Sequence, residues 1–192
     1  MKIGLYFGSF NPIHVAHLII ANHILNETEL KKIWFVVSPQ NPFKQKNSLL
    51  NEYDRLHLAR LSAEFDNRII VSDIEFNLPR PSYTIDTLTY LKEKYPNYEF
   101  SIIMGSDSFQ NLSKWKNYEK IVKDYPIYIY KREGFEIKNA LQQNITVLEA
   151  PILQISSTYI RQCIKEGKSI RYLVPENVRE EIETRRFYKK KN

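Results

Sequence analysis

The sequence has little cysteine, few glycines and no long apolar run. Its 192 residues include one cysteine, Cys163, so neither an internal disulfide nor a four-cysteine metal site can form. No segment reaches the roughly 18 apolar residues that a membrane span requires. The chain starts with a short apolar run that lacks the layout of a cleavable signal. We therefore expect a soluble cytoplasmic protein without a membrane partner.

Two common nucleotide-binding patterns are also absent. With five glycines, the chain contains neither the Gly-x-Gly-x-x-Gly fingerprint of redox Rossmann enzymes nor the complete Walker pattern Gly-x-x-x-x-Gly-Lys-Ser/Thr, and the turn after the first predicted strand has no Gly-Lys-Ser/Thr. It is nevertheless 43% hydrophobic and 26% charged, which is ordinary for a globular protein and argues against disorder. A chain of this length can bury roughly 70% of the surface that its unfolded form exposes, so its core needs no disulfide or metal.

The formal charge of +6 is concentrated at one end of the chain. Residues 185–192 hold five Lys or Arg and no acid, whereas residues 1–184 carry 23 basic against 22 acidic residues. We therefore predict one domain over residues 1–184 and a solvated basic tail over residues 185–192. A nucleic-acid-binding tail would show a steep salt dependence, but no recognised reader motif accompanies this charge, so we expect no nucleic-acid partner.

Short β-rich runs alternate with longer segments of helical periodicity. The predicted strands are Lys2–Phe7, Ile33–Val37, Arg68–Val71, Glu99–Met104, Ile127–Tyr130 and Ile145–Leu148. The predicted helices are Val15–Asn26, Glu52–Phe65, Thr84–Tyr95, Tyr118–Lys123, Thr158–Lys165 and Asn177–Arg185. This alternation predicts an α/β fold with a doubly wound, mostly parallel sheet and helices on both faces. Such sheets bind ligands at the carboxyl ends of their strands.

The turn after the first predicted strand is Gly8-Ser9-Phe10-Asn11-Pro12-Ile13-His14-Val15-Ala16-His17. Gly8 allows a phosphate to approach the backbone because no Cβ intervenes, and the proline forces a turn. His14 and His17 lie three apart at a helix start, so both can face one side. Two imidazoles beside free N–H groups at a helix N-terminus form an anion site. An ordinary pair at a helix start, or two metal ligands, are the alternatives.

A second candidate segment, Ile155-Ser156-Ser157-Thr158-Tyr159-Ile160-Arg161, precedes a predicted helix. Ser156 and Ser157 are favourable N-cap residues. Capping does not explain Arg161, which lies one turn into the helix and can bind the same phosphate as the free N–H groups.

Together these segments, about 140 residues apart, resemble the two signatures of the nucleotidylyltransferase superfamily. The usual first signature is Gly-x-Phe-Asp/Asn-Pro-x-His-x-Gly-His, with Ala16 here in place of the second Gly, and the other is Ile-Ser-Ser-Thr-x-Ile/Leu-Arg. Three further segments are similar to bacterial nicotinate-nucleotide adenylyltransferases: Arg80–Leu88, Ile103–Phe109 with Trp115, and Pro39–Lys44. The resemblance covers residues 3 to 161 and implies a Rossmann-like nucleotidylyltransferase fold.

The resemblance implies adenylyl transfer from ATP to nicotinate mononucleotide in NAD biosynthesis, with Mg²⁺ bridging the triphosphate and no metal ligands from the protein. The implied catalytic residues are His14, His17 and Arg161. The implied ATP-binding residues are Gly8, Ser9, Phe10, His14, His17, Gly105, Asp107, Ile155, Ser156, Ser157 and Arg161. The implied mononucleotide-binding residues are Ser9, Lys44, Thr84, Trp115 and Arg132. The sequence leaves open whether the protein forms a homo-oligomer.

Several alternatives remain at this point. The acceptor could instead be nicotinamide mononucleotide or phosphopantetheine, or the chain could be a cytidylyltransferase. A nucleotide-binding regulator without catalysis would bind ATP but release no pyrophosphate. Trp115 could be a core anchor and Lys44 a solvated charge, and we interpret Cys163 as a packing residue.

Overall fold

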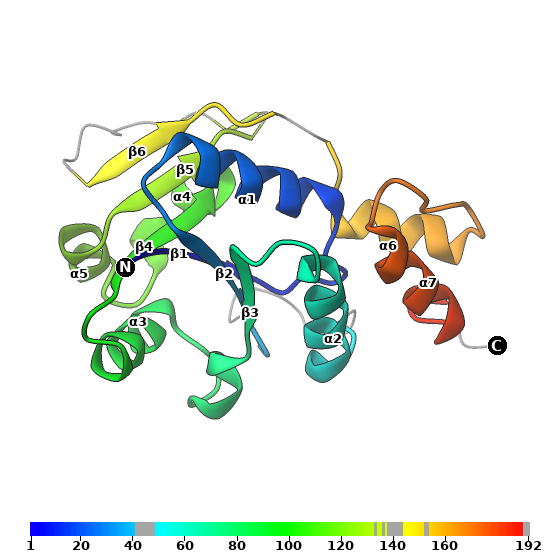
Figure 1. The fold of residues 1–192 in the computed structure, drawn as a ribbon, viewed down its shortest axis with the longest axis horizontal. Helices are drawn as coiled ribbons and strands as arrows, with labels where there is room; N and C mark the ends of the chain where they lie inside the picture. The colour runs from blue at the N-terminus through cyan, green and yellow to red at the C-terminus, as the bar shows by residue number, and fades with distance from the viewer. Residues whose placement is uncertain (41–48, 133, 136, 138–143, 152–153, 190–192) are drawn as a thin grey trace.

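A six-stranded parallel sheet forms the centre of the computed structural model, which describes residues 1–40, 49–132, 134–135, 137, 144–151 and 154–189 (Figure 1). The strands are β1 (Lys2–Gly8), β2 (Lys32–Val37), β3 (Ile69–Ser72), β4 (Glu99–Gly105), β5 (Ile127–Tyr130) and β6 (Ile145–Leu148). They follow the order β3-β2-β1-β4-β5-β6, and all neighbouring pairs are parallel. The predicted doubly wound α/β sheet is confirmed. The strand order reverses between β1 and β4, so a ligand crevice is expected at their carboxyl ends.

Helices cover both faces of this sheet, and their buried side chains join two separate core clusters. The first cluster includes side chains of α1 (Val15–Glu27), α2 (Glu52–Ala63), α6 (Ser157–Lys165) and α7 (Glu176–Thr184). The second includes side chains of α3 (Thr84–Lys94) and α5 (Tyr118–Asp124). Three short elements complete the described fold: η2 (Ile74–Asn77), α4 (Ser106–Phe109) and η3 (Leu112–Lys114).

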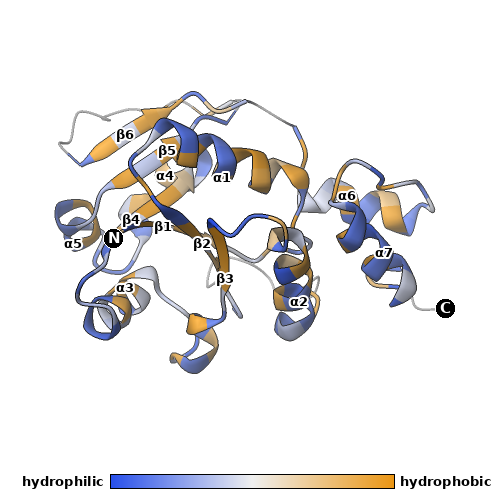
Figure 2. Ribbon diagram, viewed as in Figure 1, coloured by the Kyte–Doolittle hydropathy of each residue, from blue (hydrophilic) through white to orange (hydrophobic). Residues whose placement is uncertain are grey.

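The strands read as continuous apolar runs because both of their faces are buried. In β2, Phe35 and Val37 enter the first cluster, whereas Trp34 and Val36 enter the second. Most of the central sheet is accordingly coloured as hydrophobic in Figure 2, while the helices show mixed colours along their length. Alternate residues of each strand therefore hold the two helical layers in place.

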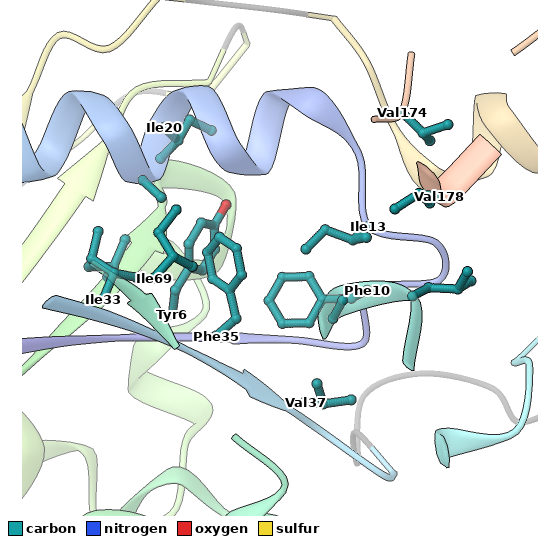
Figure 3. Close-up of a cluster of buried hydrophobic side chains, with 14 of the residues drawn as sticks. Tyr6, Phe10, Ile13, Ile20, Ile33, Phe35, Val37, Ile69, Val174 and Val178 are labelled. Carbon is teal, nitrogen blue, oxygen red and sulfur yellow. The ribbon is translucent and has the colours of Figure 1, made fainter. Parts of the chain in front are cut away.

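The turn between β1 and α1 is fixed to the first cluster by its own apolar residues. Phe10 and Ile13 are buried, and the Phe10 ring lies 5.3 Å from the Phe35 ring, centroid to centroid. Figure 3 shows both side chains pointing into the core, with Val174 and Val178 near Ile13. The polar residues of the same turn are thereby held at the carboxyl end of the sheet.

The predicted element boundaries differ from the observed ones by a few residues. The second helix ends at Ala63 instead of Phe65, whose side chain is 88% exposed and gains nothing from a further turn. The third helix ends at Lys94 instead of Tyr95. The η2, α4 and η3 elements were not predicted, since three or four residues are too few to show a periodicity.

The sequence predicts a solvated tail over residues 185–192, but part of this segment packs against the rest of the protein. Phe187 and Tyr188 pack against the first cluster, and Arg185 forms ion pairs with Glu181 and Asp54. The division into a domain over residues 1–184 and a tail over residues 185–192 stays a prediction. None of the helices in the described part of the chain is long and apolar enough to cross a membrane.

Candidate active site

A cavity of about 620 Å³ lies at the carboxyl ends of β1 and β4, where the strand order reverses. Gly8 and Gly105 end these two strands, and the cavity extends to the N-termini of α1, α3 and α6. All the predicted site residues that the structure describes line this one cavity. Lys44 lies outside the described residues. The fold thus brings together residues from both signatures and from the middle segments.

His14 and His17 stack at the start of α1, as their spacing predicts. Their ring centroids are 3.7 Å apart with an angle of 35° between the planes. The His14 backbone N–H donates to His17 Nδ1 at 3.2 Å. Because Nδ1 accepts this bond, a neutral His17 carries its proton on Nε2, which makes Nε2 a hydrogen-bond donor.

His14 is the N-cap residue of α1 and is only 4% exposed. Burial lowers its pKa to about 3, and the positive charge of Arg132 acts in the same direction. Its Nδ1 atom has no hydrogen-bond partner among the described residues. At neutral pH, His14 is therefore an uncharged imidazole, and the attraction for an anion here comes from the helix N-terminus and the arginines.

The two signatures are joined directly by hydrogen bonds, although they lie far apart in the sequence. Ser157 Oγ donates to the carbonyl oxygen of Pro12 at 2.8 Å, and Arg161 Nη1 donates to that of Asn11 at 2.7 Å. Ser156 caps α6 by accepting a bond from the Tyr159 backbone N–H. The N-termini of α1 and α6 are thereby fixed beside the same cavity, where the positive ends of both helix dipoles favour an anion.

Arg132 connects the end of β5 to the end of β4. Its Nη1 lies 3.4 Å from Asp107 Oδ2, and its Nη2 donates to Tyr130 Oη, which in turn accepts from the buried Tyr6 hydroxyl at 2.8 Å. A Cβ on Gly105 would collide with the Asp107 carboxylate. Gly105 thus leaves space for Asp107, one of the residues that the resemblance implies for ATP binding. Arg132, which we had expected at the mononucleotide, lies beside that residue.

The part of the cavity wall that comes from α3 and η3 has a different chemical character. Trp115 is partly buried against the second cluster and also lines the cavity with Tyr83 and Thr84. Beneath them, Glu75 is only 2% exposed and accepts a hydrogen bond from Thr87 Oγ1 at 2.9 Å. Burial raises the pKa of Glu75, and the hydroxyls of Ser38, Thr87 and Ser82 partly oppose that rise.

A second cavity of about 410 Å³ adjoins the first, and His14, His17 and Ile155 line both. The residues that line only the second cavity include several apolar ones: Ala16, Ile20, Phe135, Ala150 and Pro151. The histidine pair therefore stands between a polar chamber and a more apolar one.

Buried polar atoms without partners are concentrated at this site. In the described part of the chain, seven buried side-chain N or O atoms lack a hydrogen bond. Five of these atoms belong to residues that line the first cavity: Ser9, His14, Glu75, Ser82 and Asp107. Because unpaired buried polar groups are costly, such a concentration indicates a site completed by a ligand or by water.

The residues near the site that were not predicted include Tyr6, Tyr130 and Arg55. The two tyrosines lie on strands that read as ordinary apolar runs. Arg55 lies within the buried stripe of α2, beside Leu56 and Leu58. A charged residue at a position where the helical pattern requires an apolar one is the signal that could have identified it.

The fold and this site define a nucleotide-binding α/β protein, and a family model described as cytidylyltransferase-like matches residues 5–163. A Flavobacterium johnsoniae protein named "Probable nicotinate-nucleotide adenylyltransferase" is 53% identical over 99% of this chain and 100% of its own length. A Cytophaga hutchinsonii protein of the same name is 49% identical over 98% of each. The chain belongs to the nicotinate-nucleotide adenylyltransferase family.

Solved structures agree with this assignment. The Plasmodium falciparum nicotinic acid mononucleotide adenylyltransferase complexed with APC superposes with a TM-score of 0.80 at 25% identity, over 97% of this chain and 96% of that one. The same enzyme complexed with NaAD gives a TM-score of 0.83 at 24% identity, over 97% of both chains, which supports the fold. The chain is thus an adenylyltransferase with a Rossmann-like nucleotidylyltransferase fold.

Proposed function

We propose that this cavity transfers the adenylyl group of ATP to nicotinate mononucleotide, which gives nicotinate adenine dinucleotide and pyrophosphate. The observation that carries the proposal is the direct bonding of α6 to the β1–α1 turn. It fixes two helix N-termini, two imidazoles and the Arg161 guanidinium beside one cavity. This arrangement suits a substrate with several adjacent phosphates.

The two cavities suggest how the substrates are placed. The apolar walls of the second cavity, which include Ile20 and Phe135, suit the flat face of adenine. Gly105 and Asp107 are then expected to contact the ribose. Trp115 and Thr84, at the far end of the first cavity, suit the pyridine ring of the acceptor. His14 and His17 line both cavities, so the reacting phosphates meet beside them.

The reaction needs no general base. A 5′-phosphate oxygen of the acceptor, already anionic at neutral pH, forms a bond to the α-phosphorus as the bond to the β-phosphate oxygen breaks. Catalysis is then mostly alignment of the two phosphates and stabilisation of the charge that develops on their oxygens. His17 Nε2 donates to an α-phosphate oxygen, and the neutral His14 ring contacts the same group.

Arg161 and the N-terminus of α6 bind the departing β- and γ-phosphates. Ser156 and Ser157 supply backbone N–H groups there, and Ser9 lies across the cavity near the attacking phosphate. Burial lowers the pKa of Arg161, yet a guanidinium stays charged in proteins. Arg132 and Lys44 are the other cations that we expect to contact phosphate.

Mg²⁺ would enter as part of the ATP substrate. Among the described residues, no group of three or more His, Cys, Asp or Glu could hold a metal ion. Asp107 contributes one carboxylate to the cavity wall, and Mg²⁺ is commonly held by phosphates and water with few protein ligands. When bound, the ion would neutralise part of the triphosphate charge.

The proposal is tested by measuring pyrophosphate release with Mg²⁺-ATP and a panel of acceptors. We expect turnover with nicotinate mononucleotide, and much less with nicotinamide mononucleotide, phosphopantetheine or glycerol phosphate. A higher kcat/KM with phosphopantetheine would favour the corresponding adenylyltransferase instead. ATP binding without release from any acceptor would indicate a regulator.

Other expectations follow from the composition and need separate tests. We expect a cytoplasmic enzyme whose partners are its nucleotide substrates, with neither membrane nor nucleic-acid partners. Whether it forms a homo-oligomer is measured by light scattering of the full chain. Nucleic-acid binding through residues 185–192 would appear as a retention on duplex DNA that falls steeply with salt.

A further inference from the structure

Arg55 is a fully buried cation that forms no ion pair among the described residues, although the charge of Glu52 acts on it at longer range. Its side chain is 0% exposed, and none of the ion pairs among the described residues includes it. Its N–H groups instead donate to four backbone carbonyls. Nε donates to Leu50 at 3.0 Å, Nη1 to Ser9 at 2.5 Å and Ser38 at 2.9 Å, and Nη2 to Pro39 at 3.1 Å.

These carbonyls belong to chain segments that meet at the cavity. Ser9 follows β1, Ser38 and Pro39 follow β2, and Leu50 precedes α2. The guanidinium thus connects the ends of two neighbouring strands to the beginning of a helix. Because burying a charge without a paired acid is costly, the position must require these hydrogen bonds.

The residue beside the Ser9 carbonyl has a strained backbone. Phe10 has a φ of 44°, in the left-handed region that side chains other than glycine rarely adopt. Its two neighbours are both held by arginines, since Arg55 binds the Ser9 carbonyl and Arg161 binds the Asn11 carbonyl. Such a conformation persists only where the surroundings fix it.

The two arginines cannot have the same role once a substrate is bound. Arg161 lines the cavity, so part of its donor set is open to a phosphate. Arg55 is inaccessible and donates four of its five N–H groups to the backbone, so it does not touch the substrate. Tyr188 packs near both arginines. Burial raises the pKa of its hydroxyl, and the charges of Arg55 and Arg161 oppose that rise.

We propose that Arg55 is a positioning residue that holds the strained Ser9–Asn11 turn, and through it His14 and His17, in the geometry that the transfer requires. This inference rests on the proposed function for its kinetic readout. The resemblance to the superfamily signatures assigns no role to Arg55, because this residue lies outside both signature segments.

The test compares the variants R55K and R55M with the control R60M. Arg60 lies on the same helix, and its ion pair with Asp73 is largely exposed. Pyrophosphate release gives kcat and both KM values, calorimetry gives ATP affinity, and urea denaturation gives stability. All are measured well below the melting temperature of each variant.

We expect kcat of folded R55M to fall by about a hundred-fold, because displacement of reacting groups by about 1 Å has effects of that size. ATP affinity should also fall, whereas R60M should match the wild type in both. R55K keeps the charge and up to three donors, so its kcat should be intermediate. If R55M fails to fold, R55K carries the test, with a lowered kcat expected.

The role is overturned if the folded variants keep wild-type kcat and ATP affinity and lose only stability. The proposed function and the positioning role of Arg55 can fail separately. If the wild type releases no pyrophosphate with any acceptor, the proposed function fails. Weaker ATP binding by R55M, with normal binding by R60M, would still support the positioning of the turn.

Discussion

The two ends of the main cavity are built in different ways. At the phosphate end, the β1–α1 turn and the start of α6 bond directly to each other through Ser157 and Arg161. At the acceptor end, where Tyr83, Thr84 and Trp115 line the cavity, the link between segments is an exposed ion pair, between Lys116 and Asp86. Trp115 packs against the second cluster there, and the buried Glu75 carboxyl accepts a hydrogen bond from Thr87 of α3, the helix that begins at Thr84.

This difference indicates at which end of the cavity the substrate specificity can change. Under the proposed function, the phosphate end binds the triphosphate, and its side chains depend on one another through these hydrogen bonds. The acceptor end can change its aromatic and polar residues without disturbing those donors. Changes at the phosphate end should therefore affect kcat, whereas changes at the acceptor end should affect the KM of the acceptor alone.

The largest effect is expected for His17→Ala. Removing a donor to the reacting phosphate should lower the rate of pyrophosphate release by about a hundred-fold or more, with ATP still bound. The matched control is His23→Ala on the same helix, which does not line the cavity and should stay near wild type. Near-normal release by the His17 variant would show that its imidazole has no part in the transfer.

At the acceptor end, Trp115→Leu should raise the KM for nicotinate mononucleotide by roughly ten-fold, since stacking on an aromatic ring is worth about 1–3 kcal/mol. The KM for ATP should change little. Tyr118→Leu replaces a nearby exposed aromatic and is the control. An equal rise in both KM values, measured in steady-state assays, would contradict a separate acceptor end.

A smaller effect is expected in the pH dependence of stability for Glu75→Gln. Burial raises the pKa of this carboxyl above its ordinary value of 4.5, so the folded state binds its proton more tightly than the unfolded state. The wild type therefore loses stability as pH rises from 4.5 through the raised pKa, and the Gln variant lacks this loss.

Urea denaturation of both proteins between pH 4.5 and 8 measures the difference. The free energy of unfolding of the variant, relative to the wild type, should increase across this window and then level off. Parallel curves would mean that the Glu75 pKa is the same in the folded and unfolded states.

The smallest effect is expected at the C-terminus. Truncation after Tyr188 removes the last four residues, three of which are lysines. It should leave kcat, stability and the salt dependence of substrate binding unchanged. Truncation after Arg186 also removes Phe187 and Tyr188, which pack against the first cluster, and should cost about 2–4 kcal/mol of stability. Both are measured by urea denaturation. Equal stability of the two truncated chains would show that this packing is unimportant.

The closeness of the two histidines and the cap of α6 were predictable because their determinants are local. The spacing of His14 and His17 fixes their stacking on one helical turn, and Ser156 acts as the predicted N-cap. Cys163 is buried in the first cluster, as expected for a packing residue. At Arg132, in contrast, the sequence did not reveal the pairing with Asp107, because a strand-end side chain takes its direction from neighbouring strands.

The sequence by itself determined the alternation of strands and helices, the near-neutral body and the two signature segments. These depend on side-chain period, composition and spacing within a turn, which are properties of short stretches. Only the tertiary structure decided that α6 would bond to the β1–α1 turn, that Tyr188 would pack beside two arginines, and that Arg55 would bind four carbonyls. Each of these contacts depends on atoms that the packing of the whole sheet brings together. The spacing of residues along the chain does not predict that packing.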